Sequence, residues 1–551
     1  MPIHRTLLLI LLLLLTAAAA LLAQNPPQGA GELPTLEIDQ VVITRDRTIA
    51  LPPAKKGEVY DSTIYRLPAG DTVIFGERVS NLARSGGALP TYREFTSPLA
   101  MDLEASLGSY LSPRALLRAE YQQRTFDVGG MIDYRGTEGH LDSARAGSIL
   151  LQATGGLLIG ADEITPARFR AAADLSYLGD SYFLYGSRTG AADRSRSTTR
   201  WITTLESQED QELGIGLKLD IGSTSVRDRL RDTVREASGL TPAFAGRVSY
   251  GSDSLRISGG IEYMTTSLDY GTPTQTPAYL HLRGDVEWRP AERFYLSLGG
   301  FYANGEFSDS GAATVVSGRV TARYVLSPQL SVVAWFTPEL RPAAYRDMLM
   351  RAPYVAPAIT LRPESVPIRL GGGVRVRQES FSIEARVVIE QAENTPVVVA
   401  DTAGELRYDY VNSRTVGGQA AMQMKLIEKL HLDADLFVGE SVNRADDQLL
   451  PMRPSVDLRA RAEYAITEQL SGSATLQFQT EQRTVIAPTN IPSNQQTVAA
   501  RFLLGAGANY RLNDNFQAFA EATNLLGLKY DLWHGYEAPG IELRAGVRVK
   551  F

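Results

Sequence analysis

Histidine offers the widest range of acid–base and metal-binding chemistry of any side chain, and this chain of 551 residues holds only five. His4 belongs to the N-terminal apolar region, and His140, His281, His431 and His534 are far apart in sequence. None of these spacings is that of a metal site, and the chain has no cysteine to complete one. His281 and His431 fall on the polar faces of predicted strands, where solvation in a lumen accounts for them. The sequence therefore predicts no resident metal or cofactor.

Two short motifs have the residue types of catalytic or nucleotide sites but not their context. Gly179-Asp180-Ser181 is similar to the start of a serine-hydrolase motif, yet it lies at the end of a predicted strand without the strand, turn and helix that such a motif needs. Gly505-Ala506-Gly507 lacks the third glycine and the helix of a dinucleotide site. We therefore predict that the protein is not an enzyme, and we expect no nucleic-acid partner.

Arginine is concentrated on the polar faces of neighbouring predicted strands. Six arginines and two glutamates share these faces: Arg319, Arg323, Arg369, Arg375, Arg377, Glu384, Arg386 and Glu390. Lining a lumen, they would form a basic strip that attracts anions. Alternatively, they form a ladder of cross-strand ion pairs, with the surplus arginines neutralised by acidic loops. The sequence leaves both interpretations open.

The strands that would position these side chains are clearest at the end of the chain. One face of residues 541–551 is apolar and the other polar, with Ile541, Leu543, Ala545, Val547, Val549 and Phe551 on the apolar face. Strict alternation over this length, ending on an aromatic residue, predicts a membrane-spanning strand whose Val547, Val549 and Phe551 face lipid and act as a C-terminal assembly signal. Since strands cross a bilayer only as a closed barrel, many more such strands are expected.

The same alternation recurs from about Leu99 onward, for example at residues 213–221, 255–263 and 456–466. Short turns alternate with long segments. The turns are predicted at 251–254, 290–292, 327–329, 378–380, 427–429, 467–469 and 513–515, and the long segments at roughly 223–242, 265–277, 338–366, 392–410, 441–454, 482–497 and 525–540. This pattern is typical of an outer-membrane barrel. We predict an all-β fold, a transmembrane antiparallel outer-membrane β-barrel of about 22 strands over residues 99–551.

The first 98 residues differ from the rest. Residues 1–23 read as a signal peptide, with His4 and Arg5 before an apolar run and a cleavage site between Ala23 and Gln24. Residues 24–98 are rich in proline and glycine and follow no sustained period, which predicts an extended, irregular periplasmic segment. The mature protein is expected to be integral to the outer membrane of a Gram-negative cell. Beyond residue 23 no apolar run reaches the roughly 18 residues of a membrane helix.

The end of the chain resembles TonB-dependent outer-membrane receptors. The resemblance rests on Asn513-Asp514-Asn515-Phe516, residues 524–530, Gly535-Tyr536, Pro539-Gly540 and the closing strand. Near the N-terminus, a second stretch looks like the TonB box of these receptors, which implies TonB as a partner by strand addition: Ile38, Asp39, Gln40, Val41, Val42, Ile43 and Thr44. Only about 75 residues separate the signal from the first strand, too few for the family's plug domain. The chain therefore resembles a plugless relative.

Together these patterns predict passage or uptake of an unidentified solute across the outer membrane. The alternative is a structural or secretion-partner barrel with a filled lumen. Expected partners are outer-membrane lipid, the barrel-assembly machinery, TonB and the solute. A lumen of this width needs something to close it. The candidates are the segment at 24–98 and an inward-folded loop at 338–366, in which residues 343–350 are expected to form a short helix.

Overall fold

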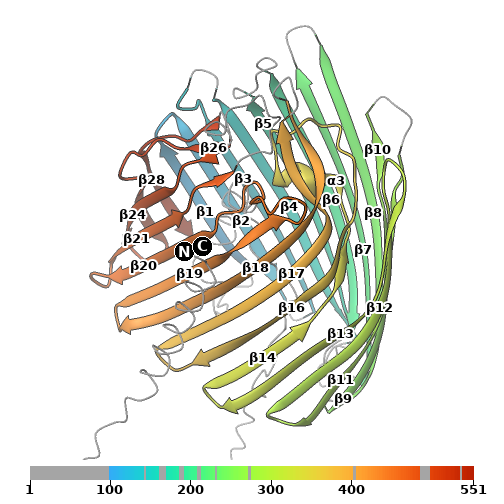
Figure 1. The fold of residues 1–551 in the computed structure, drawn as a ribbon. Coiled ribbons are helices and arrows are strands. Elements are labelled where there is room, and N and C mark those ends of the chain that lie inside the picture. The colour runs from blue at the N-terminus through green and yellow to red at the C-terminus, as the bar shows by residue number, and fades with distance from the viewer. Residues whose placement is uncertain are drawn as a thin grey trace, which may run out of the picture. The chain divides into compact units, whose positions relative to one another are not determined.

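The computed structural model describes residues 99–551 apart from 124, 142–143, 161–168, 185–191, 208–211, 230–232, 253, 271–274, 401–404, 484–496 and 534–535. The predicted signal peptide, periplasmic segment and TonB-box-like residues lie outside the described residues. Within them, one architecture dominates: long antiparallel strands joined in chain order, with one short helix at the outer end (Figure 1). None of the described helices is long and apolar enough to cross a membrane.

The barrel strands are β1 (Leu99–Gly108), β2 (Ser112–Gln122), β3 (Phe126–Thr137), β4 (Ala146–Ile159), β5 (Phe169–Phe183), β6 (Asp193–Ser207), β7 (Leu213–Arg229), β8 (Val234–Gly251), β9 (Leu255–Thr265), β10 (Ser267–Asp269), β11 (Ala278–Ala291), β12 (Phe294–Glu306), β13 (Ala312–Ser327), β14 (Leu330–Phe336), β15 (Glu339–Arg341), β16 (Glu364–Arg377), β17 (Phe381–Ala400), β18 (Leu406–Ile427), β19 (Leu430–Asn443), β20 (Val456–Ala465), β21 (Leu470–Gln479), β24 (Arg501–Arg511), β25 (Phe516–Thr523) and β28 (Glu542–Lys550). Helix α3 (Tyr345–Arg351) and the short strands β22 (Gln482–Arg483), β23 (Thr497–Val498), β26 (Asp531–Trp533) and β27 (Tyr536–Glu537) lie in the connections.

The sheet closes on itself because β28 pairs with β1, from Asp102 opposite Lys550 to Gly108 opposite Arg544. β10 and β15 continue β9 and β14 after short interruptions, so the 24 paired segments form 22 membrane-spanning strands. Closure joins the first barrel strand to the last, which is the condition for strands to cross a bilayer. The predicted antiparallel barrel and its strand number are confirmed, and the first described strand begins at Leu99.

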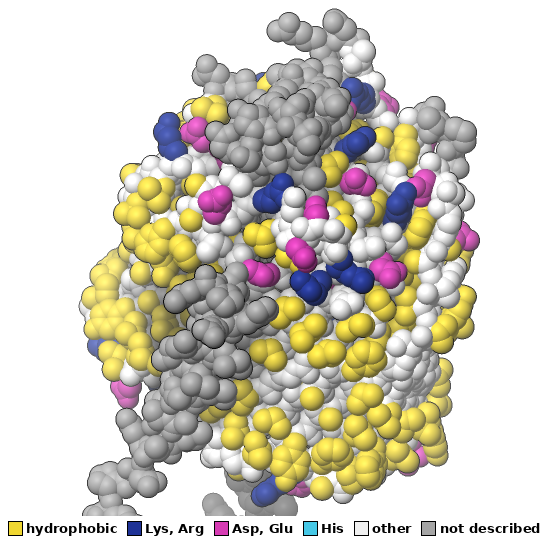
Figure 2. All heavy atoms as spheres, in the orientation of Figure 1, with side chains coloured by type: hydrophobic (Ala, Val, Ile, Leu, Met, Phe, Trp, Pro, Cys, Tyr) yellow, Lys and Arg dark blue, Asp and Glu magenta, His cyan; other side chains and the backbone are white. Residues whose placement is uncertain are grey.

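The outward face of the barrel is apolar. Val547 and Phe551 on β28 are 46% and 67% exposed, and Leu103 on the neighbouring β1 is 39% exposed, as expected for side chains that face lipid. Val549 lies on the same face but is only 7% exposed, because it pairs between Leu103 and Phe516. Figure 2 shows hydrophobic side chains over the lower wall and charged side chains gathered higher up. The predicted orientation of the closing strand agrees with this exposure.

All seven predicted tight turns fall at one end of the barrel, between strands such as β16 and β17 or β24 and β25. By the usual pattern this end is periplasmic and the other extracellular. Two of the expected long loops are wrong. Residues 223–242 and 392–410 are mostly paired strand, because β7 and β8 and then β17 and β18 continue well beyond the membrane as hairpins.

Candidate functional site

The connection between β15 and β16, residues 342–363, lies at the outer end of the lumen, and we call it the cap. It contains Pro342, Pro353, Pro357 and Pro363, which cannot donate backbone hydrogen bonds and which stiffen the chain. Its helix α3 spans residues 345–351, within two residues of the predicted helix. A segment of this composition cannot satisfy its backbone by itself, so its carbonyl groups need donors from elsewhere.

One face of α3 packs against the barrel wall. Tyr345, Met348 and Leu349, spaced three and four residues apart, are buried. They belong to one apolar cluster with Val226 of β7 and Leu268 of β10. Further along, the cap adds Ala352, Val355, Ile359 and Leu361 to this cluster. Full burial of one large aliphatic side chain contributes about 1.5–3 kcal/mol. These apolar contacts therefore offset part of the entropy lost when the cap is ordered.

Two buried arginines of β6 supply donors to the cap. Arg194, 2% exposed, forms two hydrogen bonds with the carboxylate of Asp228, each 2.6 Å long, and donates through Nη1 to the carbonyl oxygens of Pro353 and Val355. Arg196 pairs with Asp180 of β5 and donates to the Leu349 carbonyl over 3.0 Å. Each guanidinium group is thus held by a carboxylate while its remaining donors bind the cap.

Tyrosine hydroxyl groups supply further donors. Four of them come from the barrel wall and bind cap carbonyl oxygens: Tyr182 to Pro353, Tyr270 to Ile359, Tyr408 to Met348 and Tyr410 to Thr360. A fifth lies within the cap, where Tyr345 donates to Pro357 over 2.8 Å. Burial raises the pKa of the Tyr345 phenol above its ordinary value, so this hydroxyl group stays a neutral donor.

The anchors lie on opposite sides of the barrel. β6 and β18 are ten places apart in the ring of 22 strands, and the cap binds Arg194 and Arg196 on the first and Tyr408 and Tyr410 on the second. It also stacks Tyr354 on Tyr536 of β27, with 3.7 Å between ring centroids. The cap therefore crosses the outer mouth of the lumen and is fixed at both rims (Figure 1).

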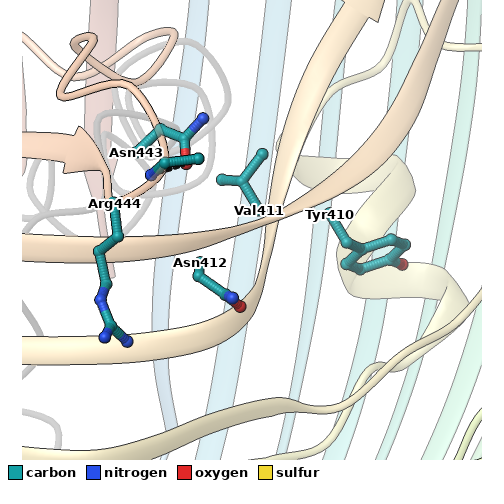
Figure 3. A pocket seen from close by; sticks show the side chains of 6 residues that line it. Tyr410, Val411, Asn412, Asn443 and Arg444 are labelled. Carbon is teal, nitrogen blue, oxygen red and sulfur yellow. Dashed lines mark hydrogen bonds between the residues drawn. The ribbon is translucent and has the colours of Figure 1, made fainter.

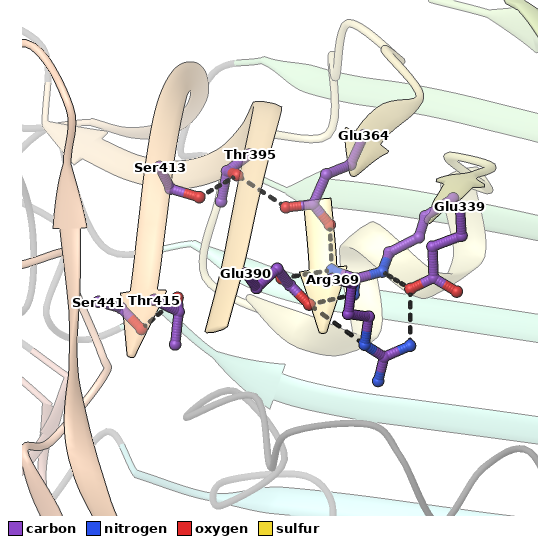
Figure 4. A network of polar contacts seen from close by, with 9 residues as sticks. Glu339, Glu364, Arg369, Glu390, Thr395, Ser413, Thr415 and Ser441 are labelled. Atoms are coloured by element: carbon purple, nitrogen blue, oxygen red, sulfur yellow. Dashed lines mark hydrogen bonds and ion pairs between the residues drawn. The ribbon is translucent and has the colours of Figure 1, made fainter. Parts of the chain in front are cut away.

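A network of charged and hydroxyl side chains lies at the base of the cap, on the inward faces of β15 to β19 (Figure 4). Arg341 pairs with Glu339, Glu364 and Glu390 over 2.6, 2.9 and 2.7 Å. Arg369 pairs with Glu339 over 3.1 Å and lies 3.5 Å from Glu390. The Thr395 hydroxyl donates a hydrogen bond to the Glu364 carboxylate and shares a second with the Ser413 hydroxyl, and Thr415 and Ser441 are hydrogen-bonded beside them. The network fixes both ends of the cap.

The predicted strip of arginines lies on the inward face, and most of its members are paired. Arg375 and Arg386 both contact Glu384, and Arg319 forms a 2.9 Å ion pair with the buried Asp285 of β11. Arg323 and Arg377 lie on the same faces and also have partners. Of the two interpretations, these contacts favour the ladder of ion pairs. Asp285 and Glu339, which were not among the predicted residues, supply two of the negative charges that the surplus arginines need as partners.

An open pocket of about 450 Å³ lies at the outer ends of β18 and β19. It is lined by Tyr410, Val411, Asn412, Asn443, Arg444 and Ala445 (Figure 3). Its Tyr410 is also a cap anchor. The pocket therefore adjoins the cap.

The residues considered for catalysis have other roles. Asp180 of the Gly179-Asp180-Ser181 motif holds Arg196 for the cap, and His281 lies 4.0 Å from Glu262 beside the Phe301 ring. Gly505 and Gly507 are small inward-facing residues of β24, where a Cβ would meet Thr475 and Ser473. His534 lies outside the described residues. Across the part of the chain that the structure describes, no three side chains are grouped as metal ligands.

The sequence identified the cap as a candidate, and Arg369 and Glu390 of the network at its base belong to the predicted strip. It did not identify the arginines of β6 or the tyrosines that bind the cap. Two features of the sequence indicate such anchors: one long connection contains four prolines, and arginine and tyrosine occur near the outer ends of strands. Pairing Arg194 with the cap nevertheless needs the closed ring, because the two are separated by more than 150 residues.

No protein-family model matches the chain, and no curated protein matches its sequence. Solved structures do match. The copper transporter OprC is 14% identical, with a TM-score of 0.65 over 82% of this chain and 80% of its own. The FrpB iron transporter from Neisseria meningitidis is 10% identical, with a TM-score of 0.66 over 83% and 82%. The ferric-catecholate import receptor Fiu from E. coli K12 is 11% identical, with a TM-score of 0.62 over 82% and 81%. At these identities the likeness shows a shared fold, and the chain resembles TonB-dependent receptors in the fold of its barrel.

Proposed function

We propose that this barrel, which shares the fold of TonB-dependent receptors, takes up a solute across the outer membrane and is closed from outside by its cap. The observation that carries the proposal is the cap itself: a proline-rich segment fixed to opposite rims of the lumen by arginine and tyrosine donors. A barrel that only scaffolds partners has no need of a separate closing element at its mouth. Structural neighbours described as copper and iron transporters support transport as the general role.

The energy source and the lower closure belong to the same proposal. The TonB-box-like residues, Ile38, Asp39, Gln40, Val41, Val42, Ile43 and Thr44, would engage TonB as an added strand. Residues 24–98 would then reach the lumen from the periplasmic side in place of a plug domain. Replacing Val41 with proline, which cannot donate to a ladder, should abolish any uptake driven by the proton gradient and leave passive conductance unchanged.

The test is conductance in planar bilayers. Because Arg341 and Glu364 are register partners, replacing residues 342–363 by Asn-Gly closes the β15–β16 hairpin without the cap. We expect full-length protein to be nearly closed, the cap deletion and a deletion of residues 24–90 each to conduct more, and the double deletion to conduct most.

Other outcomes are equally informative. If every form is silent, side chains fill the lumen and the structural or secretion-partner function gains support. If the deletion of 24–90 conducts no more than the full-length chain while the cap deletion does, the N-terminal segment is only a tether.

A further inference from the structure

The pocket at the outer ends of β18 and β19 is open to solvent and presents polar side chains from the strand and the turn. Its volume of about 450 Å³ falls within the roughly 300–1,000 Å³ of ligand pockets. Among the described residues, no acidic side chain forms an ion pair with Arg444 and no side chain hydrogen-bonds the Asn412 amide. Figure 3 shows these two side chains extending in the same direction, with Tyr410 further along β18 beside α3.

The backbone holds Arg444 in a fixed position. Its N–H group donates to the carbonyl oxygen of Asn412 over 2.8 Å, which ties the start of the turn to β18. The turn is closed by hydrogen bonds from Asn443 to Gln448 and from Asp447 to Asn443, each 2.9 Å long. Oδ1 of Asn443 accepts from the Ala445 N–H over 3.1 Å, which leaves the amide N–H₂ of Asn443 as a donor. These bonds fix the backbone of the rim, so binding a ligand orders side chains but not the turn itself.

The surrounding charges leave Arg444 as the cation of the pocket. Asp447 of the same turn pairs with Arg414 over 3.3 Å. Asp446 accepts a hydrogen bond from the Gln448 N–H, and Asp409 accepts one from the Tyr410 N–H. None of these carboxylates lines the pocket.

We propose that this pocket binds a small polyhydroxy carboxylate. A guanidinium group with no ion partner binds a carboxylate through two parallel hydrogen bonds. The two asparagine amides both donate and accept, which suits hydroxyl groups rather than a second charge. The proposal rests on the proposed function in one respect. The pocket shares Tyr410 with the cap, so a solute bound there would lie beside the cap at the outer end of the lumen.

The test uses detergent-solubilised full-length protein and isothermal titration calorimetry. Gluconate is the probe, and sorbitol, which replaces its carboxylate by a hydroxymethyl group, is the matched control ligand. We expect gluconate to bind saturably, sorbitol to bind about tenfold more weakly or not at all, and acetate to bind more weakly than gluconate. Arg444→Gln should weaken gluconate binding about tenfold, and Asn412→Ala should weaken it by a smaller factor.

The control variant is Arg407→Gln. Arg407 is an exposed arginine of β18, the strand that carries Asn412, and it does not line the pocket. It should bind gluconate as the unchanged protein does. The proposal is overturned if gluconate does not bind, if sorbitol binds equally well, or if Arg444→Gln and Arg407→Gln have the same effect. Binding is measured without transport, so these failures leave the conductance test untouched, and a silent channel would leave the binding result standing.

Discussion

Gly239 of β8 lies directly against the ring of Tyr345 in the cap: a Cβ at position 239 would be 2.7 Å from Cδ1 and 3.1 Å from Cγ of that ring. No real side chain fits there without moving Tyr345, which is fully buried. We predict that Gly239→Val displaces the cap and raises conductance in planar bilayers several-fold, because it forces the tyrosine out of its packing.

The matched control is Gly284→Val on β11, where a Cβ would meet nothing within 4 Å. Both changes put the same β-branched residue into a barrel strand. Equal conductance in the two variants, with both barrels folded, would show that the contact between Gly239 and Tyr345 does not hold the cap closed.

The buried pair Arg194–Asp228 gives a second prediction. Arg194→Met removes donors to two cap carbonyl oxygens and leaves Asp228, 4% exposed, without its counter-ion. Breaking such a pair costs about 3–5 kcal/mol. We expect trypsin added to intact cells to cleave at the exposed Arg351 much faster in this variant. Arg227→Ala, which breaks an exposed pair with Glu236, should change the cleavage rate little.

The pH dependence of cap attachment follows from Asp309 and Arg362, which join the β12–β13 connection to the cap. Burial works to raise the pKa of the Asp309 carboxyl, but the hydrogen bond and charge of Arg362 outweigh it, so this pKa lies below its ordinary value of 3.8.

A carboxyl with a lowered pKa contributes stability above its unfolded pKa and loses it as the pH falls through the folded value. Conductance should therefore stay constant from about pH 8 to pH 5 and rise only below about pH 4. Asp309→Asn should remove whatever part of the acid response belongs to this pair. A rise near neutral pH that survives this substitution would point to another group.

The two faces of the closing strand can be tested by neighbouring substitutions. Val547→Arg places a charge against lipid, at a cost of up to about 2–4 kcal/mol near the midplane. Arg548→Val removes an inward ion pair with Glu104, whose carboxylate keeps Arg114 as a second partner. The heat-modifiable folded fraction in outer membranes should fall far more for the first change. Equal losses would mean that the faces are reversed.

The alternation of side chains was enough to predict the barrel because lipid imposes one rule on every spanning strand. It held for residues 541–551, where Val547 is outward and Arg548 inward. It was not enough beyond the membrane. The sequence predicts a long loop at residues 392–410, but β17 continues through their first part with a shift in register between Ala392 and Thr395.

The candidate site was predictable only in outline. A helix within residues 343–350 could be expected because this stretch lacks strand alternation, and the structure shows that its buried residues follow helical spacing. Its partners could not be expected, since the cap lies far from Arg194 and Tyr408 in sequence and meets them only after the ring closes. The same holds for the arginine strip: pairing Arg319 with Asp285 requires the register of three consecutive strands.

The barrel wall is uneven in height. β25, β28 and β1 have 8, 9 and 10 residues, whereas β17 and β18 have 20 and 22. The short strands share few hydrogen-bonded partners, and they include the seam where the last strand meets the first. Local opening costs least where the fewest bonds must break together. Backbone amides of β25, β28 and β1 should therefore exchange with deuterium before those of β17 and β18, and the seam becomes the place where the finished ring most readily parts.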